Sequence, residues 1–346
     1  MKILVTGGAG FIGSNLCVRL IADGHEVFVI DNLHPQIHGN NAEEESITYN
    51  TIKGKVRFVK EDVCDVFCWA EFCNQDFDVI IHLAAETGTG QSMFNAYGYC
   101  KTNICSLALL NDIILRKKIN AKKIILASSR SVYGDANLDN FNLPIATKET
   151  DKLDPKSIYA ITKLTQEQLL FSGFGDIPTT ALRFQNVYGP GQSLKNPYTG
   201  ILSIFSTAIK NNKDIQVFDD GLMSRDFVYI DDVVDSILLS INNPESDGHI
   251  FNVGSGVRTT VLKVAQTLKE KYNSDVKINV TGEKMKGDIR HNFADISKIK
   301  MIGFEPKIDF DTGIQIFVNW VNSNNDIQYN NYENSVDELR KKGLLK

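Results

Sequence analysis

Short, continuous runs of apolar residues alternate with longer amphipathic stretches through the first half of this chain. The stretches 11–24 and 97–118 have the spacing of apolar positions that predicts helices. Five apolar runs rich in β-branched residues predict buried strands: KILVT (2–6), EVFVID (26–31), KVRFVKEDV (55–63), DVIIHLAA (78–85) and KKIILASS (122–129). Such strands, alternating with helices, are typical of a parallel sheet covered on both faces. The pattern therefore predicts an α/β fold with a doubly wound parallel sheet.

The pattern changes after about residue 187. Glycine, proline and asparagine cluster at 189–200, and short helical and strand-like segments follow irregularly. The run HIFNVGSG (249–256) predicts a late strand that returns to the main sheet. We therefore expect a large N-terminal domain over 1–186 that also includes 226–256. The remainder is expected to form a smaller lobe, which comprises residues 187–225 and 257–346.

Composition and charge change this picture little. The 346 residues are 23% charged with a net charge of −5, which gives no electrostatic case for binding nucleic acid or an anionic membrane. We find no run of about 18 uncharged apolar residues and no signal peptide at the N-terminus. The six cysteines contain no CxxC pair and have no histidine at ligand spacing. We therefore expect reduced structural thiols, no metal site and a cytoplasmic protein.

A glycine-rich turn, GGAGFIG, follows the first predicted strand and opens the first predicted helix. It fits G-x-G-x-x-G through Gly8, Gly10 and Gly13, and G-x-x-G-x-x-G through Gly7, Gly10 and Gly13. Such a turn lets backbone N–H groups and the helix N-terminus approach a pyrophosphate. Asp31 ends the next strand, where an acid accepts hydrogen bonds from ribose hydroxyls and repels a 2′-phosphate. This arrangement favours NAD over NADP, and the alternative is a structural turn with a solvated Asp31.

Tyr159 and Lys163 lie four residues apart in SIYAITKLTQEQLL (157–170), which has a helical pattern, so they share one face. A free tyrosine has a pKa near 10 and is a poor base at neutral pH. A nearby lysine ammonium and a nicotinamidium both favour the phenolate. Tyr159 would then take a proton from a sugar hydroxyl. By itself the pair is also common on amphipathic helices, but here it follows a dinucleotide turn and a cluster of hydroxyl residues at 128–131.

Several motifs appear in an order that resembles the extended short-chain dehydrogenase/reductases, specifically their NAD-dependent nucleotide-sugar epimerase/dehydratase group. They are TGGAGFIG, DVCDV, HLAAE, SSRSVYG, YAITK, LRFQNVYGPG and RDFVYIDDV. The resemblance implies a Rossmann domain that binds NAD and a small C-terminal lobe that binds the nucleotide-sugar. It also implies a homodimer paired through helices at about 97–118 and 157–172.

The resemblance assigns roles to the cofactor side of the site. Asp62 would meet the adenine or cap a strand, and Leu83, Ala84 and Ala85 would underlie the cofactor or simply end a buried strand. The expected cofactor contacts are Gly7, Gly10, Phe11, Ile12, Gly13, Asp31, Asn32, Asp62, Val63, Leu83, Ala84, Ala85, Asn103, Ser128, Tyr159 and Lys163.

The hydroxyl cluster bears on the reaction. By the same resemblance Ser129 joins Tyr159 and Lys163 as the third catalytic residue. Dehydratases and decarboxylases of the family carry a glutamate two residues after that serine, whereas this chain has Arg130 and then Ser131. A serine without its own base cannot readily remove a carbon-bound proton. We therefore predict a nucleotide-sugar 4-epimerase that works through a transient 4-keto sugar.

The substrate half is inferred from the resemblance alone. The loop after HLAA would supply sugar contacts, Arg130 would meet a substrate oxygen or a carboxylate or be structural, and two arginines would grip the diphosphate. The expected substrate contacts are Glu86, Thr87, Thr89, Ser129, Arg130, Asn186, Gln216, Arg225 and Arg290. The combined motifs and the ELRKKGLLK ending are most similar to dTDP-L-rhamnose 4-epimerase-like members, which suggests a dTDP-6-deoxyhexose.

Three other functions stay open at this point. The same residues would serve a 4-dehydrogenase or reductase that releases NADH or the keto sugar. A dehydratase could use an unfamiliar base such as Glu86. A sensor or scaffold could bind NAD without turnover, although it would have no need of the Ser129, Tyr159 and Lys163 set.

Overall fold

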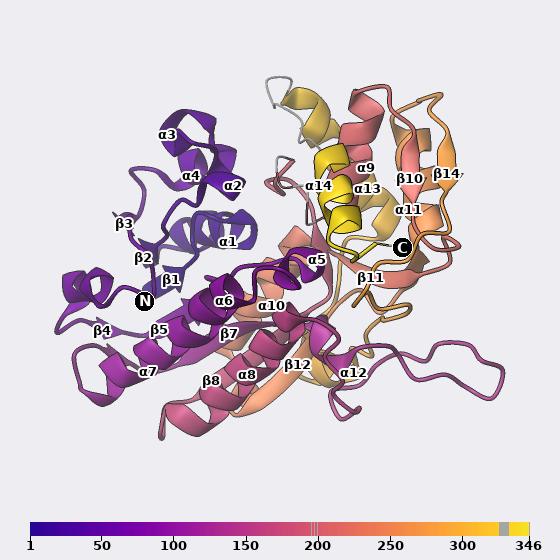
Figure 1. Ribbon diagram of the computed structural model, residues 1–346. Coiled ribbons are helices and arrows are strands. Elements are labelled where there is room, and N and C mark those ends of the chain that lie inside the picture. The colour runs from indigo at the N-terminus through magenta and orange to yellow at the C-terminus, as the bar shows by residue number, and fades with distance from the viewer. Residues whose placement is uncertain (195, 197, 199, 325–331, 346) are drawn as a thin grey trace.

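A seven-stranded parallel sheet forms the centre of the N-terminal part of the chain (Figure 1). The computed structural model describes residues 1–194, 196, 198, 200–324 and 332–345. The strand order is β12-β8-β7-β5-β1-β2-β3. The bounds are β1 (Lys2–Thr6), β2 (Glu26–Ile30), β3 (Arg57–Val59), β5 (Val79–His82), β7 (Ile124–Ser129), β8 (Thr179–Phe184) and β12 (His249–Val253). The predicted doubly wound parallel sheet is confirmed.

Helices cover both faces of this sheet. On β1, Ile3 and Val5 belong to one apolar core and Leu4 to another, since successive side chains point to opposite faces. The first core is covered by α1 (Phe11–Ala22), α4 (Ile47–Ile52) and α10 (Ile230–Asn242). The second is covered by the 3₁₀ helix Val66–Phe72, α7 (Ser106–Leu115) and α8 (Ile158–Gly173). This two-sided burial explains why the strands are apolar throughout.

Some elements are shorter than their apolar runs suggested. The predicted strand 55–63 is β3 over 57–59 only, because β3 is an edge strand that pairs with β2 alone. The run 78–85 leaves the ladder after His82, so Leu83 to Ala85 lie beyond the end of β5. The predicted helix 97–118 is divided into α6 (Ala96–Tyr99), a π-helical turn over Cys100–Cys105 and α7.

The smaller lobe contains two small sheets and several helices. One sheet has the order β13-β11-β9, with bounds Arg258–Thr260, Ser224–Tyr229 and Asn186–Tyr188, and the other pairs β10 (Ile215–Val217) with β14 (Ile278–Val280). Thus β11 belongs to the smaller sheet, whereas α10 and β12 lie with the main sheet. The lobe's helices are α9 (Ile201–Lys210), α11 (Val261–Lys271), α12 (Ser297–Met301), α13 (Phe310–Ser323) and α14 (Tyr332–Lys341).

Short elements complete the connections. They are α2 (Pro35–His38), α3 (Ala42–Glu45), α5 (Thr89–Ser92), the strand pair β4 (Asp76–Phe77) and β6 (Asn120–Ala121), and 3₁₀ helices at Arg130–Tyr133 and Pro244–Ser246. One apolar core runs from α1 and α10 into α9 and α13, so the two parts of the chain share buried side chains. Within the described ranges, no helix is both long and apolar enough to cross a membrane.

Candidate active site

The glycine turn joins β1 to α1 at the carboxyl end of the sheet, and two of its glycines have no room for a side chain. A Cβ on Gly13 would lie 2.2 Å from the carbonyl oxygen of Gly7, and one on Gly7 would lie 2.7 Å from the Ala84 nitrogen. Gly7 also has a φ of +71°. The absence of side chains lets the turn pack tightly against the end of β1 and the start of α1. A dinucleotide pyrophosphate could then approach the backbone N–H groups at the N-terminus of α1. The residues present fit that group.

Asp31 stands immediately after β2 and is tied to the turn. Its Oδ2 accepts a hydrogen bond from the Ala9 nitrogen at 3.0 Å, and its Oδ1 accepts one from the Leu33 nitrogen at 2.8 Å. His38 Nε2 lies 3.8 Å from the same Oδ1. Burial raises the pKa of the Asp31 carboxyl, and His38 opposes that rise. Asp31 therefore sits where a ribose would pass, with a histidine beside it that sequence reasoning missed.

A cavity of about 430 Å³ opens above the carboxyl ends of the strands. It brings together 20 of the 25 predicted site residues. They are Gly7, Gly10, Phe11, Ile12, Gly13, Asp31, Asn32, Asp62, Val63, Leu83, Ala84, Ala85, Glu86, Thr87, Ser128, Ser129, Arg130, Tyr159, Lys163 and Asn186. Parallel strands end at one edge of a sheet, so residues far apart in sequence meet there.

Other residues of the lining were missed from the sequence. They are His34, Gln36, Ile37, His38, Thr102, Ala127, Phe184, Gln185, Val187, Gln192, Ser193, Asn196 and Gly200. Most come from two loops, after β2 and after β9. The glycine-, proline- and asparagine-rich composition of 189–200 was the one available signal, because it marks a loop but does not say where the loop folds.

The three predicted catalytic side chains converge at the end of β7. Ser129 is the last residue of β7, and α8 starts with Ser157 as its N-cap, so Tyr159 and Lys163 lie in the first turns of that helix. The Ser129 hydroxyl lies near enough to Tyr159 to lower the pKa of that tyrosine, and its Oγ accepts a hydrogen bond from the Ser131 nitrogen at 3.2 Å. Lys163 Nζ donates to the Ala127 carbonyl oxygen at 2.8 Å and lies 5.9 Å from the centre of the Tyr159 ring.

Burial and charge act in opposite directions on these groups. Burial raises the pKa of Tyr159, while the Ser129 hydrogen bond and the Arg130 charge lower it. Burial lowers the pKa of Lys163 to about 7, and Glu167 opposes this. Burial therefore disfavours the charged form of each group, and the tyrosinate needs neighbouring positive charge to form. Lys163 and Arg130 are placed to supply it.

A buried polar network, which sequence reasoning missed, holds α8 against the sheet. Glu167 shares a helix face with Lys163, and Arg183 on β8 meets its carboxylate with two bonds, of 2.8 and 2.7 Å. The Ser128 hydroxyl donates to the same carboxylate. Arg183 also donates to the Tyr133 hydroxyl at 2.8 Å. The network fixes the helix that carries Tyr159 relative to the strand that carries Ser129.

Arg130 follows Ser129 and lines the cavity. Its Nη1 and the Ser131 hydroxyl are buried and have no hydrogen-bond partner among the described residues. Burial, and then repulsion by Arg225, lower the pKa of Arg130 to about 9, while Asp288 and Tyr159 oppose that shift. An unpartnered buried donor costs free energy, so this guanidinium is suited to an oxygen atom of a bound molecule.

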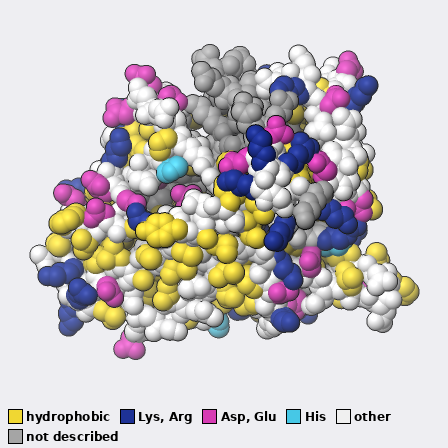
Figure 2. Space-filling model, in the orientation of Figure 1, with side chains coloured by type: hydrophobic (Ala, Val, Ile, Leu, Met, Phe, Trp, Pro, Cys, Tyr) yellow, Lys and Arg dark blue, Asp and Glu magenta, His cyan; other side chains and the backbone are white. Residues whose placement is uncertain are grey.

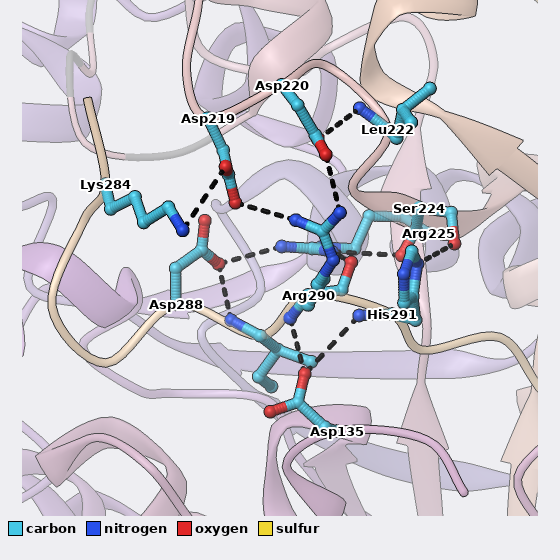
Figure 3. Close-up of polar contacts among 11 residues, drawn as sticks. Asp135, Asp219, Asp220, Leu222, Ser224, Arg225, Lys284, Asp288, Arg290 and His291 are labelled. Carbon is cyan, nitrogen blue, oxygen red and sulfur yellow. Dashed lines mark hydrogen bonds and ion pairs between the residues drawn. The ribbon is translucent and has the colours of Figure 1, made fainter. Parts of the chain in front are cut away.

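Arg225 and Arg290 do not line this cavity. Figure 3 shows them within one network of carboxylates: Arg225 Nη2 lies 2.8 Å from Asp288 Oδ1, and Arg290 bonds Asp219 and Asp220 at 2.9 and 2.6 Å. A diphosphate at either guanidinium would compete with these carboxylates. Their predicted role as diphosphate ligands stays a prediction.

Three further predicted residues also lie outside the cavity lining. The Asn103 amide accepts from the Glu86 nitrogen at 2.8 Å and donates to the Glu86 carbonyl oxygen at 3.1 Å, so it holds the start of the loop after β5. Thr89 begins α5. Gln216 lines a second cavity of about 720 Å³ in the smaller lobe.

The cysteines form no disulfide, and all six lie within the described ranges. The parts of the chain that the structure describes contain no group of three or more acidic, histidine or cysteine side chains able to hold a metal ion.

Substitution of Gly13 by alanine tests the turn. The added carbon would force the Gly7 carbonyl to move, so we expect NAD affinity to fall about tenfold or more, which corresponds to roughly 1.4 kcal/mol or more. NAD retained after purification, measured by chromatography of the denatured protein, checks this. Gly24→Ala at the far end of α1 is the control: no atom lies within 4 Å of its added carbon, and since Gly24 has a φ of +79°, this variant shows the effect of backbone strain that does not touch the turn. Equal NAD content in both variants would contradict the assignment.

Comparisons with known proteins agree with this geometry. The chain is 37% identical over 350 residues to dTDP-L-rhamnose 4-epimerase of Burkholderia thailandensis, covering 92% of this chain and 94% of that protein. Its fold matches the crystal structure of UDP-glucuronic acid 4-epimerase from Bacillus cereus with UDP-glucuronic acid and NAD, with a TM-score of 0.81 and 26% identity. The match covers 93% of this chain and 99% of that chain. UDP-glucose 4-epimerase from Thermotoga maritima with UDP-glucose matches with a TM-score of 0.80, 30% identity and the same coverage. The profile of the NAD dependent epimerase/dehydratase family matches residues 3–254, and the chain belongs to this family.

Proposed function

We propose that this protein is an NAD-dependent nucleotide-sugar 4-epimerase. The observation that carries the proposal is the meeting of Ser129, Tyr159 and Lys163 at the end of β7, inside the cavity that the glycine turn borders. The family's cofactor is NAD, and the relatives and structural neighbours above are nucleotide-sugar 4-epimerases. Fold alone would leave the reaction open, so the side chains decide it.

NAD, when bound, supplies the reversible oxidation of the sugar at C4. The chain's own residues handle the proton: Tyr159 takes it from the 4-hydroxyl, and the Ser129 hydroxyl, which lines the same cavity, is placed to bond that 4-hydroxyl. Lys163 and Arg130 favour the phenolate by their charge. Tyr159 returns the proton once the sugar has presented its other face, so no net proton is consumed.

The dehydratase alternative lacks a suitable base. Position 131 carries a serine whose hydroxyl has no partner among the described residues that could deprotonate it. Glu86 carries a carboxylate and lines the cavity, and the hydrogen bonds that Asn103 makes to it involve only the Glu86 backbone. We therefore place Glu86 among the sugar contacts with Thr87 and Asn186, and assign it no proton from C5.

The substrate we propose is a dTDP-6-deoxyhexose. The support is the 37% identity to dTDP-L-rhamnose 4-epimerase over most of both chains. Its sugar would lie beside Ser129 and Arg130, and its nucleotide would extend into the smaller lobe toward Arg225 and Gln216. Arg225 already bonds Asp288 at 2.8 Å, so binding of the diphosphate requires that carboxylate to yield.

The first test is incubation of the purified protein with dTDP-, UDP- and GDP-hexoses in deuterated water, followed by proton NMR. We expect a product inverted at C4 with no deuterium at C4 or C5, because the C4 hydrogen is returned without exchange. Deuterium in a 4-keto-6-deoxy product would instead establish a dehydratase. Accumulation of NADH from added NAD would establish a dehydrogenase, and no turnover would leave an NAD-binding sensor or scaffold.

The protein is also proposed to act as a homodimer in the cytoplasm. Figure 2 shows hydrophobic side chains gathered over the face formed by α6, α7 and α8. Tyr97, Leu115, Ile161 and Phe171 are exposed on these elements, and Tyr97 is 82% exposed. A contiguous exposed apolar face is typical of an interface between copies. Analytical ultracentrifugation of the wild type and an Ile161→Glu variant would test it.

A further inference from the structure

The C-terminal helix α14 lies between the two parts of the chain, beside α9 and above α5 (Figure 1). Its apolar residues and those that follow it, Val336, Leu339, Leu344 and Leu345, form a separate buried cluster. Met93 and Phe94, just after α5, pack against this cluster from the sheet side. Phe218 and Met285 pack against it from the smaller lobe. The helix therefore touches both the loop over the predicted sugar site and the lobe predicted to hold the nucleotide.

Polar contacts fasten the helix on both sides. Arg340 bonds both oxygens of Glu283 at 2.9 and 2.8 Å, which is the two-bond geometry that guanidinium and carboxylate prefer. The Leu344 carbonyl oxygen accepts from the Lys286 nitrogen at 2.8 Å. On the other side, Lys342 Nζ lies 3.6 Å from the centre of the Phe94 ring. The position of α14 is thus set by directional contacts as well as by apolar packing.

The cavity of about 720 Å³ in the smaller lobe is bounded by this helix. Val336, Asp337 and Arg340 supply one wall, and α9, Gln216 and Phe218 supply others. Thr207 on α9 also lines it, and the hydroxyl of this buried threonine has no hydrogen-bond partner among the described residues. An aromatic face, an amide and an unpartnered hydroxyl suit a planar heterocycle that both stacks and accepts or donates hydrogen bonds.

We propose that α14 forms the outer wall of the nucleoside end of the substrate site, and that Arg340 positions that wall through Glu283. The inference rests on the proposed nucleotide-sugar function, which makes a nucleoside diphosphate the ligand. Because α14 also packs on Met93 and Phe94, the same helix links the nucleoside end of the site to the sugar end. Arg340 is a positioning residue, since its guanidinium is occupied by Glu283.

The test measures the affinity of the full-length, NAD-loaded protein for dTDP and UDP by titration calorimetry. We expect Arg340→Gln to raise the Kd for the nucleotides about tenfold, and Arg340→Lys to restore only part of it because lysine cannot make the paired bonds. KM for the nucleotide-sugar should rise by a similar factor while kcat stays within about twofold. The control is Arg57→Gln, an exposed arginine on the edge strand β3 in an ion pair with Glu26 on β2.

Three other outcomes overturn the inference. Unchanged nucleotide affinity in Arg340→Gln would show that α14 is not part of the nucleotide site. Loss of bound NAD and a fall in Tm together with nucleotide affinity would show a general structural role. Absence of nucleotide binding by the wild type would remove the site itself. Tight nucleotide binding without C4 inversion of any sugar would contradict the epimerase function alone, and the variants would still decide the role of α14.

Discussion

A Tyr159→Phe protein is expected to fold and to retain NAD, yet to lose about 10²–10⁴-fold in kcat for C4 inversion. The substitution removes only the hydroxyl that we propose receives the proton of the 4-hydroxyl. The half-buried ring remains, with Lys163 Nζ 5.9 Å from its centre. Turnover of the nucleotide-sugar, followed by NMR at saturating substrate, checks the result.

The matched control for this variant is Tyr97→Phe, because Tyr97 is exposed and lines neither cavity. It should keep the wild-type kcat. Undiminished turnover by Tyr159→Phe would exclude Tyr159 as the acid–base group. If the wild type and both variants bound NAD but turned over no sugar, the sensor function would take precedence.

The second large effect concerns stability. Arg183→Met should lower the free energy of unfolding by about 3–5 kcal/mol, because it leaves the buried Glu167 carboxylate without its partner. The same change removes the bond to Tyr133. Urea unfolding followed by circular dichroism measures the loss, at a pH where the carboxylate is charged in the unfolded chain.

The control for Arg183→Met is Arg116→Met, an exposed arginine paired with Asp112 across one helical turn. Arg116→Met should lower the free energy of unfolding by no more than about 0.5 kcal/mol. A double variant, Arg183→Met with Glu167→Leu, should recover part of the loss, because no charge is then left buried. A cost below about 1 kcal/mol for Arg183→Met would mean that Glu167 takes up a proton or finds water.

Much of the fold and of the predicted NAD-binding site could be predicted from local sequence. The strands 2–6, 26–30 and 124–129 lie where their apolar runs predicted, since burial on both faces demands continuous apolar sequence. The turn after β1 was recognisable because only glycine fits a Cβ position 2.2 Å from a carbonyl oxygen. Spacing alone put Tyr159 and Lys163 on one helix face.

Other features had no local signal. The edge strand β3 shortened because it has a neighbour on one side only. Asn103 was expected at the cofactor, whereas its amide holds the Glu86 backbone. Glu167 and Arg183 are 16 residues apart and lie on α8 and β8, so neither segment by itself predicts that they pair.

Sequence alone was enough to predict the parallel sheet, the dinucleotide turn and the pairing of Tyr159 with Lys163 on one helix face, because each depends on periodicity or on residues close together along the chain. Ser129 was added by resemblance to the family. The remainder depended on long-range packing. Arg225 and Arg290 could be read as diphosphate ligands, but the folded chain pairs them with Asp288, Asp219 and Asp220. The wall that α14 adds to the second cavity likewise arises only when the end of the chain packs on α9 and Phe94. Such contacts are set by shape and charge across the whole molecule, and no short stretch of sequence encodes them.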